Sequence, residues 1–121
     1  LESLYHIGCM IHQGRWDGEL PQWYPYSDTH PQLSVRESLD AVAAYLRHSG
    51  APSLVASTRV IIAPGYRYRI VSGIVTNFHQ PQSTLLLLVS AFVGGDWRPM
   101  YDYALAHGFR FLSYGDATLM L

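Results

Sequence analysis

The feature that most constrains this sequence is a short polar stretch lying between two apolar runs. Residues 70–75 form the first run and residues 85–93 the second, and Val75 to Thr84 join them with side chains rich in hydrogen-bonding groups. In α/β proteins, ligand chemistry tends to lie where a strand leads into a polar turn that opens a buried helix. The stretch is therefore the best candidate for a functional site in the chain.

Several segments carry the apolar spacing of helices. They are residues 1–13, 34–48, 84–93 and a segment that begins after Asp96. Ser34, with Glu37 three residues later, forms a capping box at the start of the second segment. Residues 84–93 are apolar on nearly every side, as in a helix that is covered all round. The face that we expect to point inward from the last helix comprises Met100, Tyr103, Ala104 and His107.

Other segments are predicted as strands. Residues 59–63 and 66–75 are expected to pair as a hairpin about Pro64–Gly65. Residues 109–112 form a short closing strand before a polar turn at 113–116. The alternation of helices and strands indicates an α/β architecture in which helices pack on a small mixed sheet.

Composition limits the classes of function. Charged residues make up 14% of the chain, against about a quarter in ordinary domains, so part of the surface is expected to face another domain or chain. The net charge of −1 gives no electrostatic sign of nucleic-acid binding. The single cysteine, Cys9, fits a reducing compartment and is expected to be buried and inert. The apolar runs are too short to span a membrane, so we expect a cytoplasmic protein. The chain begins at Leu1 without a methionine, which suggests a fragment of a longer protein.

His79, Asn77 and Asp116 are the polar groups best placed for chemistry. A neutral imidazole near pH 7 acts as a general base or an orienting donor, or it simply hydrogen-bonds the turn. Asp116 either accepts hydroxyl hydrogen bonds from a ligand or forms the turn. Ser83 and Thr84 stand where a helix begins, so they either cap it or help its N–H groups to receive an anion.

Arg67 and Arg69 alternate with tyrosines on the second predicted strand, so they share one of its faces. That face meets a phosphate or an acidic partner, or it is simply solvated. The 6 histidines and Cys9 show no metal-ligand spacing, so the sequence predicts no metal site.

Four ordered motifs in the second half of the chain give more information about function than composition and residue spacing do. In order, they are PGYRYRIV at 64–71, TNFHQPQSTL at 76–85, LVSAF at 88–92 and RFLSYGD at 110–116. They closely resemble the C-terminal end of the S-adenosylmethionine:tRNA ribosyltransferase-isomerases of queuosine biosynthesis. The resemblance covers nearly the whole chain and is tightest from residue 60 onward. One departure is Ser72, where that family usually carries an aspartate.

The resemblance implies a partial domain of a larger two-domain enzyme. Residues 1–121 would be the C-terminal part of its α/β catalytic domain, with the N-terminal remainder and a second, β-rich domain absent. S-adenosylmethionine would be consumed as a ribosyl donor to the 7-aminomethyl-7-deazaguanine base at the wobble position of tRNA. The ribosyl group would be transferred and isomerised, giving epoxyqueuosine-tRNA, adenine and methionine. The fragment alone is expected to be inactive and to self-associate through uncovered surface.

Carried onto this chain, the resemblance implies catalytic roles for three residues. His79 would take a proton or orient the reacting amine, and Asn77 would fix a polar edge of the base or sugar. Asp116 would hold ribose hydroxyls or the ammonium group of the donor. Contacts with substrate are expected from Thr76, Ser83, Thr84, Tyr114, Gly115, Arg67 and Arg69.

A second interpretation is a non-catalytic RNA-binding module on the same scaffold. Residues 15–33 are broken by prolines, and their aromatic side chains either pack onto the domain or stand exposed and stack bases. A module that had lost catalysis would be expected to lose Asn77, His79 or Asp116, and all of these are present. A third interpretation, an unrelated α/β enzyme acting on a small molecule, requires the ordered motifs to recur by chance.

Overall fold

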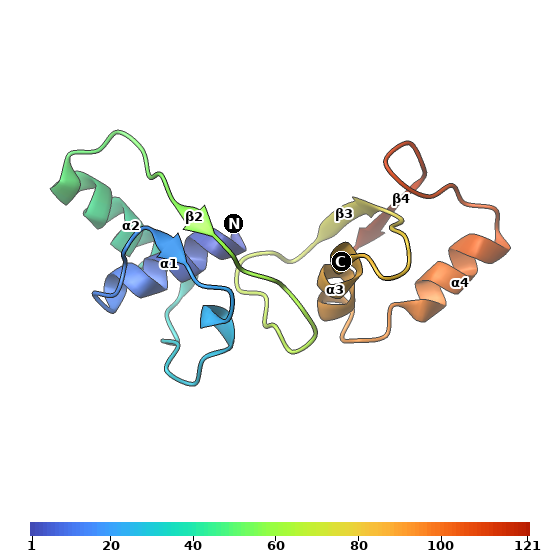
Figure 1. Cartoon of the computed structure of the whole chain (residues 1–121), viewed down its shortest axis with the longest axis horizontal. Helices are drawn as coiled ribbons and strands as arrows, with labels where there is room; N and C mark the ends of the chain where they lie inside the picture. The colour runs from blue at the N-terminus through green and yellow to red at the C-terminus, as the bar shows by residue number, and fades with distance from the viewer. The chain divides into compact units, whose positions relative to one another are not determined.

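The computed structural model describes residues 1–121, which fall into two compact units, Leu1–Ile61 and Ile62–Leu121. The first unit contains helix α1 (Glu2–His12), strand β1 (Glu19–Leu20), the 3₁₀ helix η1 (Tyr24–Tyr26), helix α2 (Val35–Ser49) and strand β2 (Ser57–Thr58). The second unit contains strand β3 (Ile74–Asn77), helices α3 (Thr84–Phe92) and α4 (Arg98–Ala106), and strand β4 (Ala117–Met120) (Figure 1). The mixture of helices and strands confirms the α/β class. None of the helices has the length and apolar character needed to cross a membrane.

Helices α1 and α2 approach each other so closely that their contact requires glycine. A Cβ atom at Gly8 would overlap both the side chain and the backbone carbonyl group of Ser38. At the same contact the Ser38 hydroxyl donates to the carbonyl oxygen of Tyr5 at 2.5 Å, and both residues are fully buried. The predicted capping box of Ser34 and Glu37 is present, so the start of α2 is set by its own first turn.

A cluster of aromatic and histidine rings joins α1 to the proline-broken segment 15–33. His6 and His30 are buried, and Nδ1 of His6 lies 2.7 Å from Nε2 of His30. Tyr24 lies against both histidine rings, and its hydroxyl donates to Oε1 of Gln13 at 2.6 Å. Burial raises the pKa of the Tyr24 hydroxyl above its usual value. These contacts confirm that the segment packs onto its own unit through Tyr24, whereas Trp23 is 60% exposed.

The core of the second unit forms around the segment that follows β3. Its buried residues are Phe78, Leu86, Tyr101 and Ala104, with Trp97, Met100 and Phe111 packed against them. Strands β3 and β4 pair in antiparallel fashion, from Ile74 opposite Met120 to Asn77 opposite Ala117. This register places the polar end of β3 beside the turn that precedes β4.

The predicted hairpin of residues 59–63 and 66–75 is wrong. Pro64–Gly65 does form a turn, in which the amide of Tyr66 donates to the carbonyl oxygen of Ala63 at 3.0 Å. The flanking segments take other partners, because β2 pairs in parallel with β1 and β3 pairs with β4. Two separate two-stranded sheets result. A turn sequence acts locally, whereas the choice of strand partner depends on which side chains meet in the folded chain.

Residues 109–112 do not form the predicted closing strand, and β4 follows the polar turn instead. Phe109 and Phe111 pack on Phe78, with ring centroids 5.8 and 5.3 Å away from it. These aromatic side chains close the core without pairing along a strand. Aromatic residues favour strands and cores alike, which explains why their spacing misplaced the strand.

Helix α3 is not covered all round by this chain, contrary to the sequence prediction. It buries Leu86 and Val89, whereas Leu85 and Leu87 are 51% and 39% exposed. Uniform apolarity predicted burial on every side, but the segment packs by one face only. An apolar face of α3 is therefore left on the surface of the second unit.

The inward face of α4 also differs from the prediction. Ala104 is buried and Met100 packs against the core as expected, but Tyr103 and His107 are exposed and Tyr101 is buried in their place. Trp97, Tyr101 and Ala104 follow helical spacing as well as the predicted set does. The core selects the stripe that contains Tyr101, because this side chain reaches the Phe78 ring.

Candidate functional site

The candidate site is built on the segment that follows β3. Phe78 is buried and anchors this segment in the core, with its ring centroid 5.2 Å from that of Tyr101 and 5.3 Å from that of Phe111. Asn77 and His79, on either side of the buried Phe78, are each half-buried.

His79 is held at both its backbone and its ring. Its amide donates to the hydroxyl of Tyr101 at 2.9 Å. Burial raises the pKa of that Tyr101 hydroxyl above its usual value, and the hydrogen bond from the His79 amide opposes this shift. In the ring, Nε2 lies 2.8 Å from Oγ1 of Thr76, on β3. With Nε2 engaged by Thr76, Nδ1 is the other ring nitrogen that has the capacity to accept a proton.

Asn77 ties the end of β3 to the turn before β4. Its Nδ2 lies 3.4 Å from the carbonyl oxygens of both Gly115 and Asp116. These long hydrogen bonds fix the direction of the amide group and leave its Oδ1 as an acceptor. Thr76 thus contacts His79, and Asn77 contacts the turn at Gly115 and Asp116.

The carboxylate of Asp116 is directed at Arg110. Oδ2 accepts from the backbone amide of Arg110 at 2.8 Å, and Oδ1 lies 3.3 Å from its guanidinium. These two hydrogen bonds hold the pKa of the Asp116 carboxyl below its usual value. A Cβ atom at Gly115 would overlap the carbonyl group of Arg110, so this tight turn requires glycine there. The geometry matches the turn-forming alternative for Asp116, and its ligand-binding role stays a prediction.

A pocket of about 260 Å³ opens beside these residues, and we call it the polar pocket. Its lining comprises Asn77, His79, Gln80, Ser83, Leu85, Leu112 and Ser113. Ser83 caps α3, because its Oγ accepts from the amide of Leu85 at 3.2 Å. Capping and pocket lining are thus combined in one residue. Thr84 is the exposed first residue of α3 and does not line the pocket.

Leu112, on the edge of the polar pocket, has a left-handed backbone with φ of 70°. For a residue other than glycine this conformation costs about 1–2 kcal/mol. Two hydrogen bonds maintain it, from the Leu112 amide to the carbonyl oxygen of Phe78 at 2.8 Å and from the Gly115 amide to the Leu112 carbonyl oxygen at 2.9 Å. Gln82, in the turn before α3, has φ of 69°. Such conformations cluster at functional sites.

A second pocket of about 460 Å³ lies along α4, and we call it the aromatic pocket. Its lining comprises Gln80, Pro81, Trp97, Arg98, Tyr101, Asp102, Leu105, Phe111 and Leu112. Gln80 and Leu112 line both pockets, so the polar and aromatic pockets are neighbours. No group of three or more metal-binding side chains is placed to hold a metal ion.

The remaining predicted contacts lie apart from the polar pocket. Tyr114 is 98% exposed, at the tip of its turn. Arg67 and Arg69 lie between the turn at Pro64–Gly65 and β3, outside any strand, so they do not share the predicted strand face. Their proposed contacts with substrate stay predictions.

Tyr101 and Arg110 are the residues that sequence reasoning missed. Tyr101 holds the His79 backbone, and Arg110 binds the Asp116 carboxylate. A signal for Tyr101 was available, because Pro99 favours the first turn of a helix and therefore places the helix start close to Arg98. Counting from that start puts Tyr101 one turn beyond Trp97, on the same face.

Comparison with known proteins extends this description. A family model described as "Queuosine biosynthesis protein" matches residues 34–120. The chain is 49% identical over 86 residues to an S-adenosylmethionine:tRNA ribosyltransferase-isomerase of Paraburkholderia xenovorans, covering 69% of this chain and 24% of that relative. It is 54% identical over 68 residues to the enzyme of the same name from Xanthobacter autotrophicus, covering 55% of this chain and 19% of the relative.

A solved structure is similar as well. The crystal structure of an S-adenosylmethionine tRNA ribosyltransferase from Thermotoga maritima matches with a TM-score of 0.54 and 38% sequence identity, covering 69% of this chain and 31% of that chain. This chain therefore spans between 19% and 24% of the curated relatives described above and about a third of the solved structure.

Proposed function

The chain belongs to the queuosine biosynthesis protein family, and we propose that it forms the C-terminal part of the catalytic domain of an S-adenosylmethionine:tRNA ribosyltransferase-isomerase. In this proposal the ribosyl group of S-adenosylmethionine is transferred to the aminomethyl group of a 7-deazaguanine base at the tRNA wobble position and is isomerised there. Epoxyqueuosine-tRNA forms, and adenine and methionine are released. We place the reaction in the cytoplasm, where its tRNA substrate is found.

The observation that carries the proposal is the position of His79. It lines the polar pocket together with Asn77, and its backbone and ring are fixed by Tyr101 and Thr76. A general base must be held in a defined orientation and must reach the substrate directly. The hydrogen bond between Nε2 and Thr76 supports the first requirement, and we propose that Nδ1 of His79 meets the second by facing the substrate.

The chemistry gives such a base a clear task. A proton leaves the carbon next to the positively charged sulfonium, and adenine departs. The aminomethyl nitrogen bonds to the ribosyl carbon that adenine has left, and the epoxide closes as the carbon–sulfur bond breaks and methionine departs. The sulfonium charge makes the C–H bond more acidic, so a neutral imidazole near pH 7 is a suitable acceptor. We assign this proton to Nδ1 of His79, and we assign to Oδ1 of Asn77 a hydrogen bond from the sugar or the base.

The other predicted contacts take supporting roles in this proposal. Ser83 closes one side of the polar pocket at the start of α3, where backbone N–H groups favour negative charge. Asp116 and Gly115 hold the turn that fixes Asn77. Arg67 and Arg69 would meet tRNA phosphates, for which the arginine fork is well suited.

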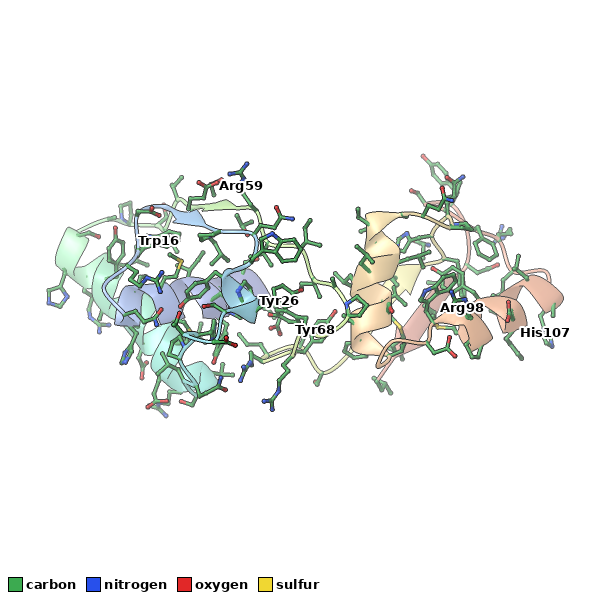
Figure 2. The ribbon with its side chains drawn as sticks, turned by 60° about the horizontal axis from the view of Figure 1, so that its bottom comes forward. Trp16, Tyr26, Arg59, Tyr68, Arg98 and His107 are labelled. Carbon is green, nitrogen blue, oxygen red and sulfur yellow. The ribbon has the colours of Figure 1, made fainter.

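Replacement of His79 by Gln in the full-length protein tests the assignment. Glutamine keeps a polar side chain of similar size but cannot accept a proton near pH 7, so adenine release should slow at least about a hundredfold. His107→Gln is the matched control, because His107 is exposed at the end of α4 and lines neither pocket (Figure 2). A decrease of less than about tenfold for His79→Gln would contradict the assignment.

The same assay separates the proposal from the RNA-binding alternative. A full-length protein that binds the acceptor tRNA yet releases no adenine from S-adenosylmethionine would support the non-catalytic module. Adenine release that depends on the tRNA would support the transferase.

A further inference from the structure

We propose that the aromatic pocket binds the amino-acid half of S-adenosylmethionine, that is, a zwitterionic amino acid with a sulfur-containing apolar side chain. This inference rests on the proposed function, because it divides that one substrate between the two neighbouring pockets. The amino-acid end lies in the aromatic pocket, and the ribosyl end reaches the polar pocket.

The walls of the aromatic pocket suit a sulfur-containing chain. The rings of Trp97 and Tyr101 have centroids 5.0 Å apart, and those of Tyr101 and Phe111 are 5.9 Å apart. Aromatic rings attract cations through their faces, and they make favourable contacts with thioether sulfur. A sulfonium combines both features. The volume of about 460 Å³ lies within the range of small-molecule sites.

The charges along the aromatic pocket suit the two ends of an amino acid. Arg98 and Asp102 lie one turn apart on α4, both exposed, and no ion pair joins them. The Arg98 guanidinium lies 5.5 Å from the Trp97 ring centroid. Figure 2 places Arg98 at the first turn of α4, at the opposite end of the helix from His107. A carboxylate would pair with the Arg98 fork, and an ammonium group would pair with Asp102.

The adjacency of the pockets gives this placement a chemical consequence. Gln80 and Leu112 belong to both linings. A ligand whose amino acid fills the aromatic pocket therefore carries its sulfonium towards this shared border. The carbon on the far side of the sulfonium then enters the polar pocket, which His79 lines and where the proposed function assigns it the proton.

Nuclear magnetic resonance of the full-length protein tests the proposal by binding alone, without any turnover. The probes are L-methionine, L-methioninol (which lacks the carboxylate) and S-adenosylmethionine, titrated at millimolar concentrations. L-methionine and S-adenosylmethionine should shift the Trp97 indole signal and the α4 amides, while the indoles of Trp16 and Trp23 in the other unit stay unchanged. L-methioninol should bind about tenfold more weakly than L-methionine, because its partner Arg98 stays unpaired.

Variants at the rim of the aromatic pocket test whether Arg98 binds the carboxylate of the ligand and Asp102 binds its ammonium group. Arg98→Met should weaken L-methionine about tenfold and abolish the preference over L-methioninol. Asp102→Asn should weaken both ligands, since both carry the ammonium group. Arg47→Met and Asp28→Asn, exposed in the other unit, are the matched controls and should change nothing.

Three results would overturn the proposal. They are a Trp97 signal that does not move with L-methionine, equal binding of L-methionine and L-methioninol, and an unchanged affinity in Arg98→Met. An apolar segment of polypeptide as the true occupant would give the first of these.

Methionine binding and adenine release test this inference and the proposed function separately. Adenine release by the full-length protein without methionine binding at Trp97 overturns only this inference. Methionine binding without adenine release supports the site and contradicts the reaction.

Discussion

Replacement of Tyr101 by Phe should loosen the segment that carries His79 while leaving the surrounding core packed. The Tyr101 side chain is 4% exposed, and its ring contacts Phe78 and Trp97. Phenylalanine keeps this ring and removes the hydroxyl that accepts a hydrogen bond from the His79 amide at 2.9 Å. The change therefore isolates one hydrogen bond at the base of the candidate site.

The expected magnitude follows from the surroundings of that bond. A typical hydrogen bond contributes about 0.5–1.5 kcal/mol net, and a buried donor left unsatisfied costs about 1–3 kcal/mol. His79 is half-buried, so water replaces the hydroxyl only in part. We expect local opening at His79 to become easier by about 1–2 kcal/mol, which corresponds to about 5- to 30-fold faster exchange of its amide hydrogen.

Hydrogen exchange measured residue by residue reads this change directly. The control is Tyr103→Phe, which removes a hydroxyl from the same helix at a position that is 58% exposed. That variant should leave the exchange of the His79 amide unchanged. Turnover of the full-length protein should also fall in Tyr101→Phe, because the imidazole is no longer held in one orientation.

Unchanged exchange at His79 in Tyr101→Phe would refute this reasoning. The hydrogen bond to Tyr101 would then contribute nothing to the order of the segment. The position of His79 would depend on Thr76 and on the burial of Phe78 instead. Faster exchange throughout the second unit would point to a different cause, a general loss of core packing.

Other predictions address the two units and the turn before β4. Gly8→Ala should lower the free energy of unfolding of the first unit by about 1–3 kcal/mol, since the new methyl group overlaps Ser38; a denaturant titration that gives an unchanged midpoint would contradict the close contact. The Asp116 carboxyl has a lowered pKa when folded, so its contribution to stability is present above about pH 4 and is lost as the pH falls through the folded pKa. Unfolding followed between pH 6 and pH 2 should accordingly show wild type converging on Asp116→Asn at the acid end, and a constant difference would count against the contact with Arg110. The 121-residue chain alone should release no adenine from S-adenosylmethionine and acceptor tRNA, and any tRNA-dependent release would disprove this.

Much of the local structure was predictable because its causes are local. The capping box at Ser34 and Glu37 begins α2, and Gly50 ends it with a left-handed backbone, as its sequence position suggests. The polar stretch after β3 was identified from two apolar runs and their junction. His79 and Asn77 in this stretch both line the polar pocket, and the catalytic roles assigned to them stay predictions.

Other features were unpredictable because residues far apart in sequence decide them. Strand β3 pairs with β4 and not with the segment across the nearby turn, since pairing depends on which faces meet after the chain has folded. Two stripes of α4 carried similar apolar patterns, and contact with Phe78 selected the one containing Tyr101. The Asp116 carboxylate, by contrast, is held locally by Arg110, six residues earlier, and its ligand-binding role stays a prediction.

The sequence by itself therefore determined the helix ends, the polar segment after β3 and the family, because each is encoded by neighbouring residues or by ordered motifs. Tertiary structure alone decided that His79 rests on Tyr101 and Thr76, and that an aromatic pocket adjoins the polar one. The physical reason is that hydrogen bonds and packing act over a few ångströms in space. Their partners come together only when distant parts of the chain share one core.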